Sequence, residues 1–449
     1  MKKYSYLLTS ALALTLSGSA ATLDTIPRNN NIQLVVKPAP ANSAPMKSAP
    51  APASAPQQLN NNARPAGAPP LNNTPALNYN NGPQTITGVI PAEGTRATPI
   101  TVSGTHFGSN ASAVQLKING VAAIITGISD NQIQATVPDR AGSGPITVII
   151  DGKTTVGSYF RYTWRGALST FSQSVWRPRR LIRDSRGYLY VTDRDHHSIR
   201  QINNFGEATT IAGGGAATSV DGQGSAASFT DPLGLAVDGA GNLYVIDHYY
   251  TIRKISTTGA VTTIPGTGNS SFGEIHSIAV DRTGTTIYVG QIGKIRKLTP
   301  AGAVSDFVTA ANFNATSMTV GPSGDLYVSS GYTLYKVNTA GMMSVLAGSS
   351  YQGDADGYGA AAHFIGITGL TTDPAGNIFA CEYSGNDYGT GDSRIRKISR
   401  DGEVTTIKGT DGGRFSINWP SGIAVDLNNA NVLYVSDEIT TGVSKITLQ

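Results

Sequence analysis

Cysteine occurs once in the sequence, as Cys381, so no disulfide can form within the chain. Charged residues are sparse, at 14%, and the formal net charge is only +4, to which Lys2 and Lys3 contribute. No continuous basic stripe with interleaved aromatic residues is present, which argues against binding to nucleic acid. The marked apolar run at residues 6–16 is too short for a stable membrane span.

The N-terminal residues are typical of a secretory signal peptide. Lys2 and Lys3 precede the apolar run and small residues follow it, which predicts a signal peptide over residues 1–21. No cysteine stands at the cleavage point, so we expect no lipid anchor and no other membrane anchor. The mature protein is therefore expected to be secreted or periplasmic.

Residues 22–82 are rich in Pro, Ala and Asn. Such a segment cannot bury enough apolar surface to offset its chain entropy, which predicts a disordered linker. From residue 83 the pattern changes to short β-branched strands between Gly and Pro, as in ITVSGTHFG from Ile100 and GPITVII from Gly144. This pattern predicts a small antiparallel sandwich. These motifs resemble an IPT/TIG domain, which implies an immunoglobulin-like β-sandwich over residues 83–164.

Glycine is abundant, with 52 residues, and much of it stands in turns that precede a short apolar strand. One such motif reads GNLYVID where it ends at Asp247. Related copies end at Asp193, Asp247, Gln291, Ser330, Glu382 and Asp437. Further turns around each copy separate four apolar segments, which predicts a series of four-stranded antiparallel sheets.

The fourth strand of this unit follows the motif five times, as in GAVTTIPG from Gly259. The missing sixth copy stands before the first motif, as GALSTFS from Gly166, whereas the last strand at residues 442–448 has no partner after it. An open edge strand would promote aggregation. We therefore expect residues 167–171 to complete the last sheet and to close a ring.

Three features resemble the NHL-repeat family of β-propellers. They are the GNLYVID motif, the IRKI run at Ile252 and Ile395, and the segments DGQGSAASFTDP from Asp221 and DGYGAAAHF from Asp356. The resemblance implies an all-β fold in which residues 165–449 form a six-bladed propeller. It implies little about function, because the family includes protein scaffolds, RNA binders and lyases.

In a propeller, the connections between sheets and the loops after second strands share one face, so we expect binding at that loop-rich rim. Aligning the repeats brings aromatic rings, histidines and a cation to it. The candidate binding residues are Arg179, His196, His197, His248, Tyr249, Tyr250, His276, Tyr332, Tyr383 and Tyr388. Tyrosine rings offer flat amphipathic surfaces for sugar rings or peptides. The histidines leave a metal or catalytic centre as an alternative.

Other repeated polar residues are assigned to the scaffold. The carboxylates Asp193, Asp247, Glu382 and Asp437 share one position, where we expect them to accept backbone N–H groups at a turn. A shared cation site is the alternative. The cations Arg200, Arg253, Arg296 and Arg396 recur in third strands, where their aliphatic stems are expected to cover an apolar face. Cys381 aligns with ordinary strand residues, which predicts a packed side chain rather than a nucleophile.

We interpret the protein as a non-enzymatic binding or scaffold protein that engages a protein or glycan partner through its loop-rich rim. No cofactor, metal or catalytic residue is assigned. One alternative is an enzyme, a metal-dependent lyase or lactonase with its site at the propeller axis. That alternative predicts that His276 converges with His196, His197 or His248. A second alternative is a structural component of the cell envelope.

Overall fold

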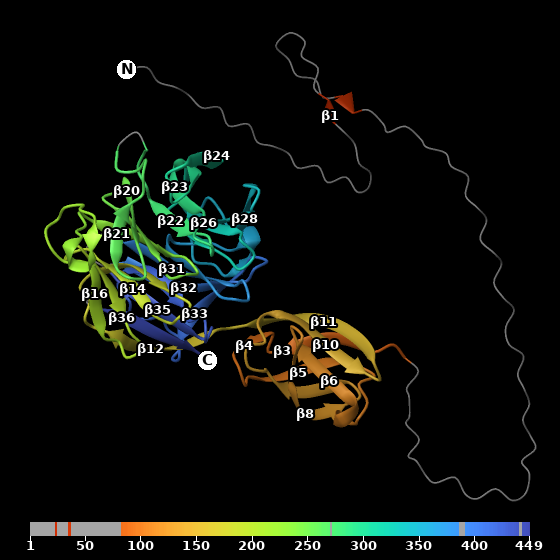
Figure 1. Ribbon diagram of the computed structural model, residues 1–449. Coiled ribbons are helices and arrows are strands. Elements are labelled where there is room, and N and C mark those ends of the chain that lie inside the picture. The colour runs from red at the N-terminus through yellow and green to blue at the C-terminus, as the bar shows by residue number, and fades with distance from the viewer. Residues whose placement is uncertain (1–22, 25–34, 37–81, 270–271, 386–390, 440–441) are drawn as a thin grey trace, which may run out of the picture. The chain divides into compact units, whose positions relative to one another are not determined.

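The computed structural model describes residues 23–24, 35–36, 82–269, 272–385, 391–439 and 442–449 (Figure 1). Strands are the main regular element among these residues, and the helical elements among them are three short 3-10 turns, η1 (Ala111–Ala113), η2 (Gly224–Ala226) and η3 (Gly359–Ala361). The predicted all-β class is thus confirmed. In this part of the chain no helix is long and apolar enough to cross a membrane.

The predicted signal peptide lies outside the described residues. Of the predicted linker, the structure describes Gly82 and the short strands β1 (Leu23–Asp24) and β2 (Val35–Val36), which pair with each other.

The first domain consists of two sheets. One sheet has the order β3 (Thr85–Ile90), β5 (Pro99–Thr105), β9 (Gln132–Thr136), β8 (Ile124–Ser129). The other has the order β4 (Glu93–Gly94), β11 (Lys153–Tyr162), β10 (Gly144–Ile150), β6 (Val114–Ile118), β7 (Val121–Ala122). Alternation along each strand sends one side chain in two inward, so that β6 buries Val114, Leu116 and Ile118 and exposes Gln115.

The remaining strands form six repeats, which we number in chain order. Repeat 1 contains β13 (Pro178–Arg183), β14 (Leu189–Asp193), β15 (Ser198–Ile202) and β16 (Ala208–Gly213). Repeat 2 contains β18 (Pro232–Val237), β19 (Leu243–Asp247), β20 (Thr251–Ile255) and β21 (Ala260–Thr263). Repeat 3 contains β22 (Ser277–Val280), β23 (Ile287–Leu298) and β24 (Val304–Asn314).

The later repeats have the same plan. Repeat 4 contains β25 (Ser317–Val320), β26 (Leu326–Ser330), β27 (Thr333–Val337) and β28 (Met343–Gly348). Repeat 5 contains β30 (Ile367–Thr372), β31 (Ile378–Gly385), β32 (Gly391–Ile398) and β33 (Glu403–Gly409). Repeat 6 contains β34 (Pro420–Val425), β35 (Val432–Asp437) and β36 (Val443–Leu448), completed by β12 (Arg165–Ser172).

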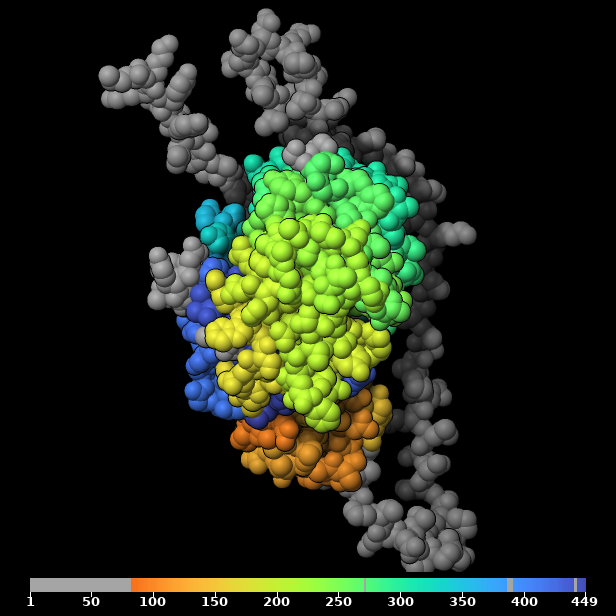
Figure 2. All heavy atoms as spheres, turned by 60° about the vertical axis from the view of Figure 1, so that its left-hand side comes forward, coloured from red at the N-terminus to blue at the C-terminus, as the bar shows by residue number. Residues whose placement is uncertain are grey.

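The first strands of the repeats contact one another in a ring. β13 contacts β18, and the contacts continue through β22, β25, β30 and β34 back to β13. Repeats 1 to 3, coloured yellow to green, accordingly lie side by side in Figure 2. β12 pairs antiparallel with β36, so the expected closing strand is confirmed. A parallel pairing of β12 with β33 also joins repeats 5 and 6 into one path of eight strands, whose end strands β30 and β34 touch, so this sheet nearly closes on itself.

The third strands are packed on both faces. Ile252 and Ile255 in β20 are three residues apart, so they point to opposite sides of their sheet, and both are buried. Ile252 joins the apolar cluster toward repeat 3, and Ile255 joins the cluster toward repeat 1. Each repeat therefore buries side chains against both of its neighbours.

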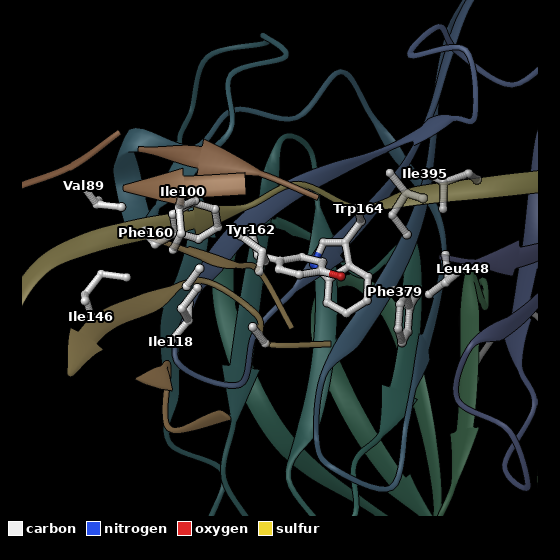
Figure 3. Packing of buried hydrophobic residues seen from close by; sticks show 14 of the residues in the cluster. Val89, Ile100, Ile118, Ile146, Phe160, Tyr162, Trp164, Phe379, Ile395 and Leu448 are labelled. Atoms are coloured by element: carbon white, nitrogen blue, oxygen red, sulfur yellow. The ribbon is translucent and has the colours of Figure 1, made fainter. Parts of the chain in front are cut away.

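Trp164, which directly precedes β12, joins the sandwich core to the repeats (Figure 3). Its ring lies 4.8 Å from that of Tyr162, and both belong to a cluster that includes Phe379 and Leu448. The ammonium of Lys397 lies 3.4 Å from the centre of the Trp164 ring. Burial lowers the pKa of Lys397 to about 8, although Asp373 and Glu403 act in the opposite direction.

Replacing Lys397 with Met is expected to remove a pH dependence of stability. The pKa of Lys397 falls from 10.5 to about 8 on folding, so between these values the unfolded chain binds a proton that the folded chain does not. The free energy of unfolding therefore rises with pH in this window, and the penalty for the charged amine is fully present below it. Urea denaturation measures the free energy of unfolding at about pH 8 and pH 9.5. Between these pH values it should rise by about 1–2 kcal/mol more in the natural protein than in the variant. The same change with pH in both proteins would contradict this prediction.

Candidate functional site

The repeated carboxylates at the ends of second strands are buried. Asp247 accepts the backbone N–H of Asp231 at 2.8 Å, and Asp437 accepts those of Asn418 and Trp419 at 2.9 and 3.1 Å. The predicted acceptance of backbone N–H groups is thus confirmed, but these donors lie in the connection before the first strand of the repeat. In the turn after its own strand, Asp437 also accepts the N–H of Ile439 at 3.1 Å. Burial raises the pKa of Glu382 to about 7, although Arg396 beside it acts in the opposite direction.

The third-strand arginines hold these carboxylates from the other side. Arg253 and Arg396 have side chains with 0% exposure and lie 3.2 Å from Asp247 and Glu382. Each also binds an aspartate of the preceding connection, Asp221 at 2.8 Å or Asp356 at 3.0 Å, and lies 5.3 Å from a phenylalanine ring in it. The predicted scaffold role is thus confirmed, but the guanidinium groups are buried along with the stems. The segments that begin at Asp221 and Asp356 are the parts of the chain that cover these guanidinium groups.

The predicted histidines lie on three loops, and His196 and His197 share one of them. His196 is 55% exposed and binds Asp193 through Nδ1 at 2.9 Å. His248 is exposed, whereas Nδ1 of His197 and Nε2 of His276 are buried and have no hydrogen-bond partner among the described residues. Within the same part of the chain, no three His, Cys, Asp or Glu side chains are grouped closely enough to hold a metal ion. A metal site of three such ligands is therefore not found there, and the convergence of His276 with another histidine stays a prediction.

The backbone is strained on this rim. His197, His248 and Tyr249, in the loops after β14 and β19, have φ values of 49°, 52° and 62°, and Arg177 before β13 has 43°. Side-chain-bearing residues rarely adopt this left-handed conformation, which costs about 1–3 kcal/mol each. Contacts hold the loops in place, since Asp231 accepts the N–H of His248 at 3.0 Å and binds Arg194 at 2.7 Å.

The predicted tyrosines differ in exposure. Tyr249, Tyr250 and Tyr332 are half-buried on the rim. Tyr383 is only 8% exposed, and its ring is stacked on Trp419 at 4.9 Å. The prediction that Tyr383 offers a free flat surface is therefore wrong, because Trp419 covers it. Tyr388 lies outside the described residues.

Arg180 is a residue that the sequence reasoning missed. The predicted Arg179 is half-buried, lies 3.9 Å from Glu438 and lies beside Arg180. The Arg180 guanidinium donates to the carbonyl oxygens of Thr316, at 3.3 Å, and of Thr368 and Ser421. Because these carbonyls come from three other repeats, the guanidinium lies inside the ring of first strands. Burial lowers the pKa of Arg180, and Arg179 acts in the same direction.

The strand register explains how this side chain fits. A bulge in β13 lies between Pro178 and Leu181, and it includes Arg180. The equivalent positions in the other first strands hold Gly or Ser, namely Gly234, Ser277, Ser317, Gly369 and Gly422. Small residues in five strands leave room for one long side chain from the sixth.

A cavity of about 440 Å³ opens on the rim between repeats 5 and 6. It is lined by Arg394 and Ile395 of β32, Thr406 to Lys408 of β33, the segment 412–417, and Asp354 and Asp356 of the connection before β30. Nothing in the periodicity of the sequence indicated it, because it forms where two irregular connections meet.

Cys381 is fully buried in β31, and burial raises the pKa of its thiol to about 11. The prediction of a packed, unreactive side chain is confirmed.

Comparison with known proteins supports the fold. The IPT/TIG domain family matches residues 84–163, which contain the two sheets of the sandwich, so the predicted immunoglobulin-like domain is confirmed. No curated protein matches the chain. The chain is thus an all-β protein with an immunoglobulin-like domain followed by a ring of sheets.

Several solved structures are similar to a large part of the chain. A protein of unknown function from Bacteroides thetaiotaomicron is 20% identical, with 82% of this chain and 99% of that chain covered and a TM-score of 0.50. An auxiliary nutrient binding protein from the same organism is 16% identical, with 82% and 98% covered and a TM-score of 0.49. Virginiamycin B lyase from Staphylococcus aureus is 14% identical, with 63% and 99% covered and a TM-score of 0.44. At these identities the similarity concerns the fold alone.

Proposed function

We propose that the six repeats form a closed, NHL-like six-bladed propeller and that the protein is an extracytoplasmic binding protein, secreted or periplasmic. Residues 1–21 act as its signal peptide, and residues 22–82 act as a spacer. Its loop-rich rim engages a protein or glycan partner without catalysis. The ring of contacts among first strands and the closing strand β12 support the propeller assignment.

The strained rim backbone is the observation that carries the binding role. Of the ten described non-glycine residues with positive φ, four stand in adjoining rim segments, at Arg177, His197, His248 and Tyr249. A loop with no role beyond connection would accumulate glycine at such positions, because glycine adopts them without strain. Strain that is retained with functional side chains is typical of binding surfaces.

Replacing His248 with Gly separates stability from function. At a φ of 52° the substitution relieves strain, so we expect the free energy of unfolding to rise by up to about 1 kcal/mol. Binding of the full-length protein to arrayed glycans and peptides is expected to weaken, because a rim side chain is lost. Ala97→Gly, at a φ of 61° in the sandwich, is the matched control that should leave binding unchanged.

Two outcomes would contradict the proposal. One is the absence of binding to any arrayed glycan or peptide, and the other is binding that His248→Gly and Ala97→Gly affect equally. Elemental analysis of the purified protein tests the enzyme alternative in parallel. Stoichiometric zinc or calcium, whose removal by a chelator lowers the melting temperature, would favour the metal-dependent lyase or lactonase.

A further inference from the structure

The cavity between repeats 5 and 6 lies over a short unpaired stretch of one strand edge. β33 pairs at this edge with β29 (Gly357–Tyr358) through Glu403 and Val404, and with β12 through Lys408 and Gly409. The cavity lies over the residues between these pairings, which include Thr406 and Ile407. The strand edge is therefore covered on both sides of the cavity and open within it.

The connection that enters repeat 6 differs from the connections that enter repeats 2 and 5. Those that enter repeats 2 and 5, residues 214–231 and 349–366, each contain a short strand, a 3-10 turn and a fully buried phenylalanine. The connection that enters repeat 6, residues 410–419, is shorter and has no such strand or turn. Its Phe415 and Ile417 are buried in the core.

The acidic and basic side chains along one edge of the cavity are paired with one another. Arg394, whose side chain is 5% exposed, binds Asp354 at 2.7 Å and Asp392 at 2.8 Å. Asp392 also binds Arg414, whose side chain is 57% exposed. These residues form a continuous row of alternating acceptors and donors beside the cavity, and Lys408 lines the cavity outside this row. A charged ligand that binds to the row would have to displace one of its members, which makes a charged ligand unfavourable at the row.

The wall of the cavity that faces the protein core is apolar. Ile395, Ile407, Phe415 and Ile417 line it and belong to the buried cluster shared with the sandwich. A ligand that fits both the apolar wall and the row of charged side chains has an apolar face and several hydroxyl groups at its edge. Hydroxyls can donate to carboxylates and accept from guanidinium groups at the same time, without breaking the ion pairs. Sugar rings have this combination of faces and edges.

We infer that this cavity binds an uncharged carbohydrate of one or two rings. A volume of about 440 Å³ lies within the range of sites for small ligands. The inference rests on the proposed function, since it narrows the partner to a glycan and places one or two sugar rings of that glycan in the cavity between repeats 5 and 6. The row of Asp354, Arg394, Asp392 and Arg414 supplies the hydrogen bonds, and Phe415 supplies the apolar contact.

Titration calorimetry of the full-length protein with uncharged sugars tests this. The probes are glucose, maltose, cellobiose and lactose, with glucuronic acid and glucose 6-phosphate as charged comparators. We expect an uncharged sugar to bind more tightly than both comparators. Arg414→Met and Asp354→Asn should each weaken that binding at least tenfold, because each removes a partner of the hydroxyls. Arg400→Met, an exposed arginine of the turn before β33, is the matched control and should leave binding unchanged.

The outcomes separate this inference from the proposed function. Thermal melting of each variant first establishes that it folds. If no uncharged sugar binds, or if the cavity variants bind as tightly as Arg400→Met, the carbohydrate inference is overturned. In that case the proposed function still stands if arrayed peptides or glycans bind to the protein and His248→Gly weakens this binding. Tighter binding of the charged comparators, strengthened at low salt, would also overturn the inference.

Discussion

Arg396→Met is expected to lower the free energy of unfolding by about 3–5 kcal/mol, the largest effect that we predict for a single substitution. The guanidinium and its partner Glu382 both have 0% side-chain exposure, and they lie 3.2 Å apart. Removing the cation leaves a buried carboxylate without its counter-charge. Urea denaturation at neutral pH measures the loss.

The loss should also depend on pH. Burial raises the pKa of Glu382 to about 7 with Arg396 present, and loss of the arginine would raise it further. A carboxyl group whose pKa is raised on folding is destabilising above its unfolded value and ceases to be so when protonated. The variant is therefore expected to lose less stability at about pH 5 than at about pH 8, because the folded state can protonate Glu382 at the lower pH.

A second substitution distinguishes an ion-pair scaffold from a cation site. In the double variant Arg396→Met with Glu382→Gln, no fully buried charge is left without this partner, since Asp356, the other carboxylate bound by Arg396, is 25% exposed. Most of the lost stability should therefore return. Arg400→Met, which is exposed, should change the free energy of unfolding by less than about 0.5 kcal/mol. A loss below about 1 kcal/mol for Arg396→Met would show that Arg396 does not hold the carboxylate. The alternative of a bound cation would then gain weight.

The arrangement of strands followed from local patterns. Glycine turns and alternating apolar residues recur at a regular spacing, and each depends on a few neighbouring residues only. The closing role of β12 was predictable because a strand pattern was missing at one end and present at the other. Local patterns did not predict that the guanidinium of Arg253 is buried, because its partner Asp221 lies in an irregular connection.

The candidate site was less predictable, because its contacts join segments that are distant in sequence. Tyr383 was predicted to offer a free aromatic surface, but its ring is stacked on that of Trp419. The cavity depends on how the connections before β30 and before β34 approach β33. Arg180 did leave a signal, since it is the one large residue among glycines and serines in the aligned first strands. The candidate residues were instead taken from the position one residue earlier, which holds Arg179 in this strand and Leu233, His276, Thr316, Thr368 and Ser421 in the others.

Arg180→Met is expected to lower the free energy of unfolding by about 2–3 kcal/mol. The guanidinium donates to carbonyl oxygens of Thr316, Thr368 and Ser421, and methionine leaves these acceptors without that donor. The removal of a buried cation offsets part of the loss, since a methionine side chain needs no hydration. Arg179→Met is the matched control, because its pair with Glu438 is long, at 3.9 Å, and the Arg179 side chain is 28% exposed. It should change stability by less than about 1 kcal/mol.

Arg180→Gly then separates hydrogen bonding from space filling. Glycine is the residue of three equivalent first strands, but at this position it removes both the donor and the volume. If hydrogen bonds across the ring are the main contribution, Arg180→Met and Arg180→Gly both destabilise, and Gly does so somewhat more because it leaves a void. If volume alone matters, Met retains the stability of the natural protein and only Gly loses it. That second result would contradict the role of Arg180 as a cation that ties four repeats together through their backbone.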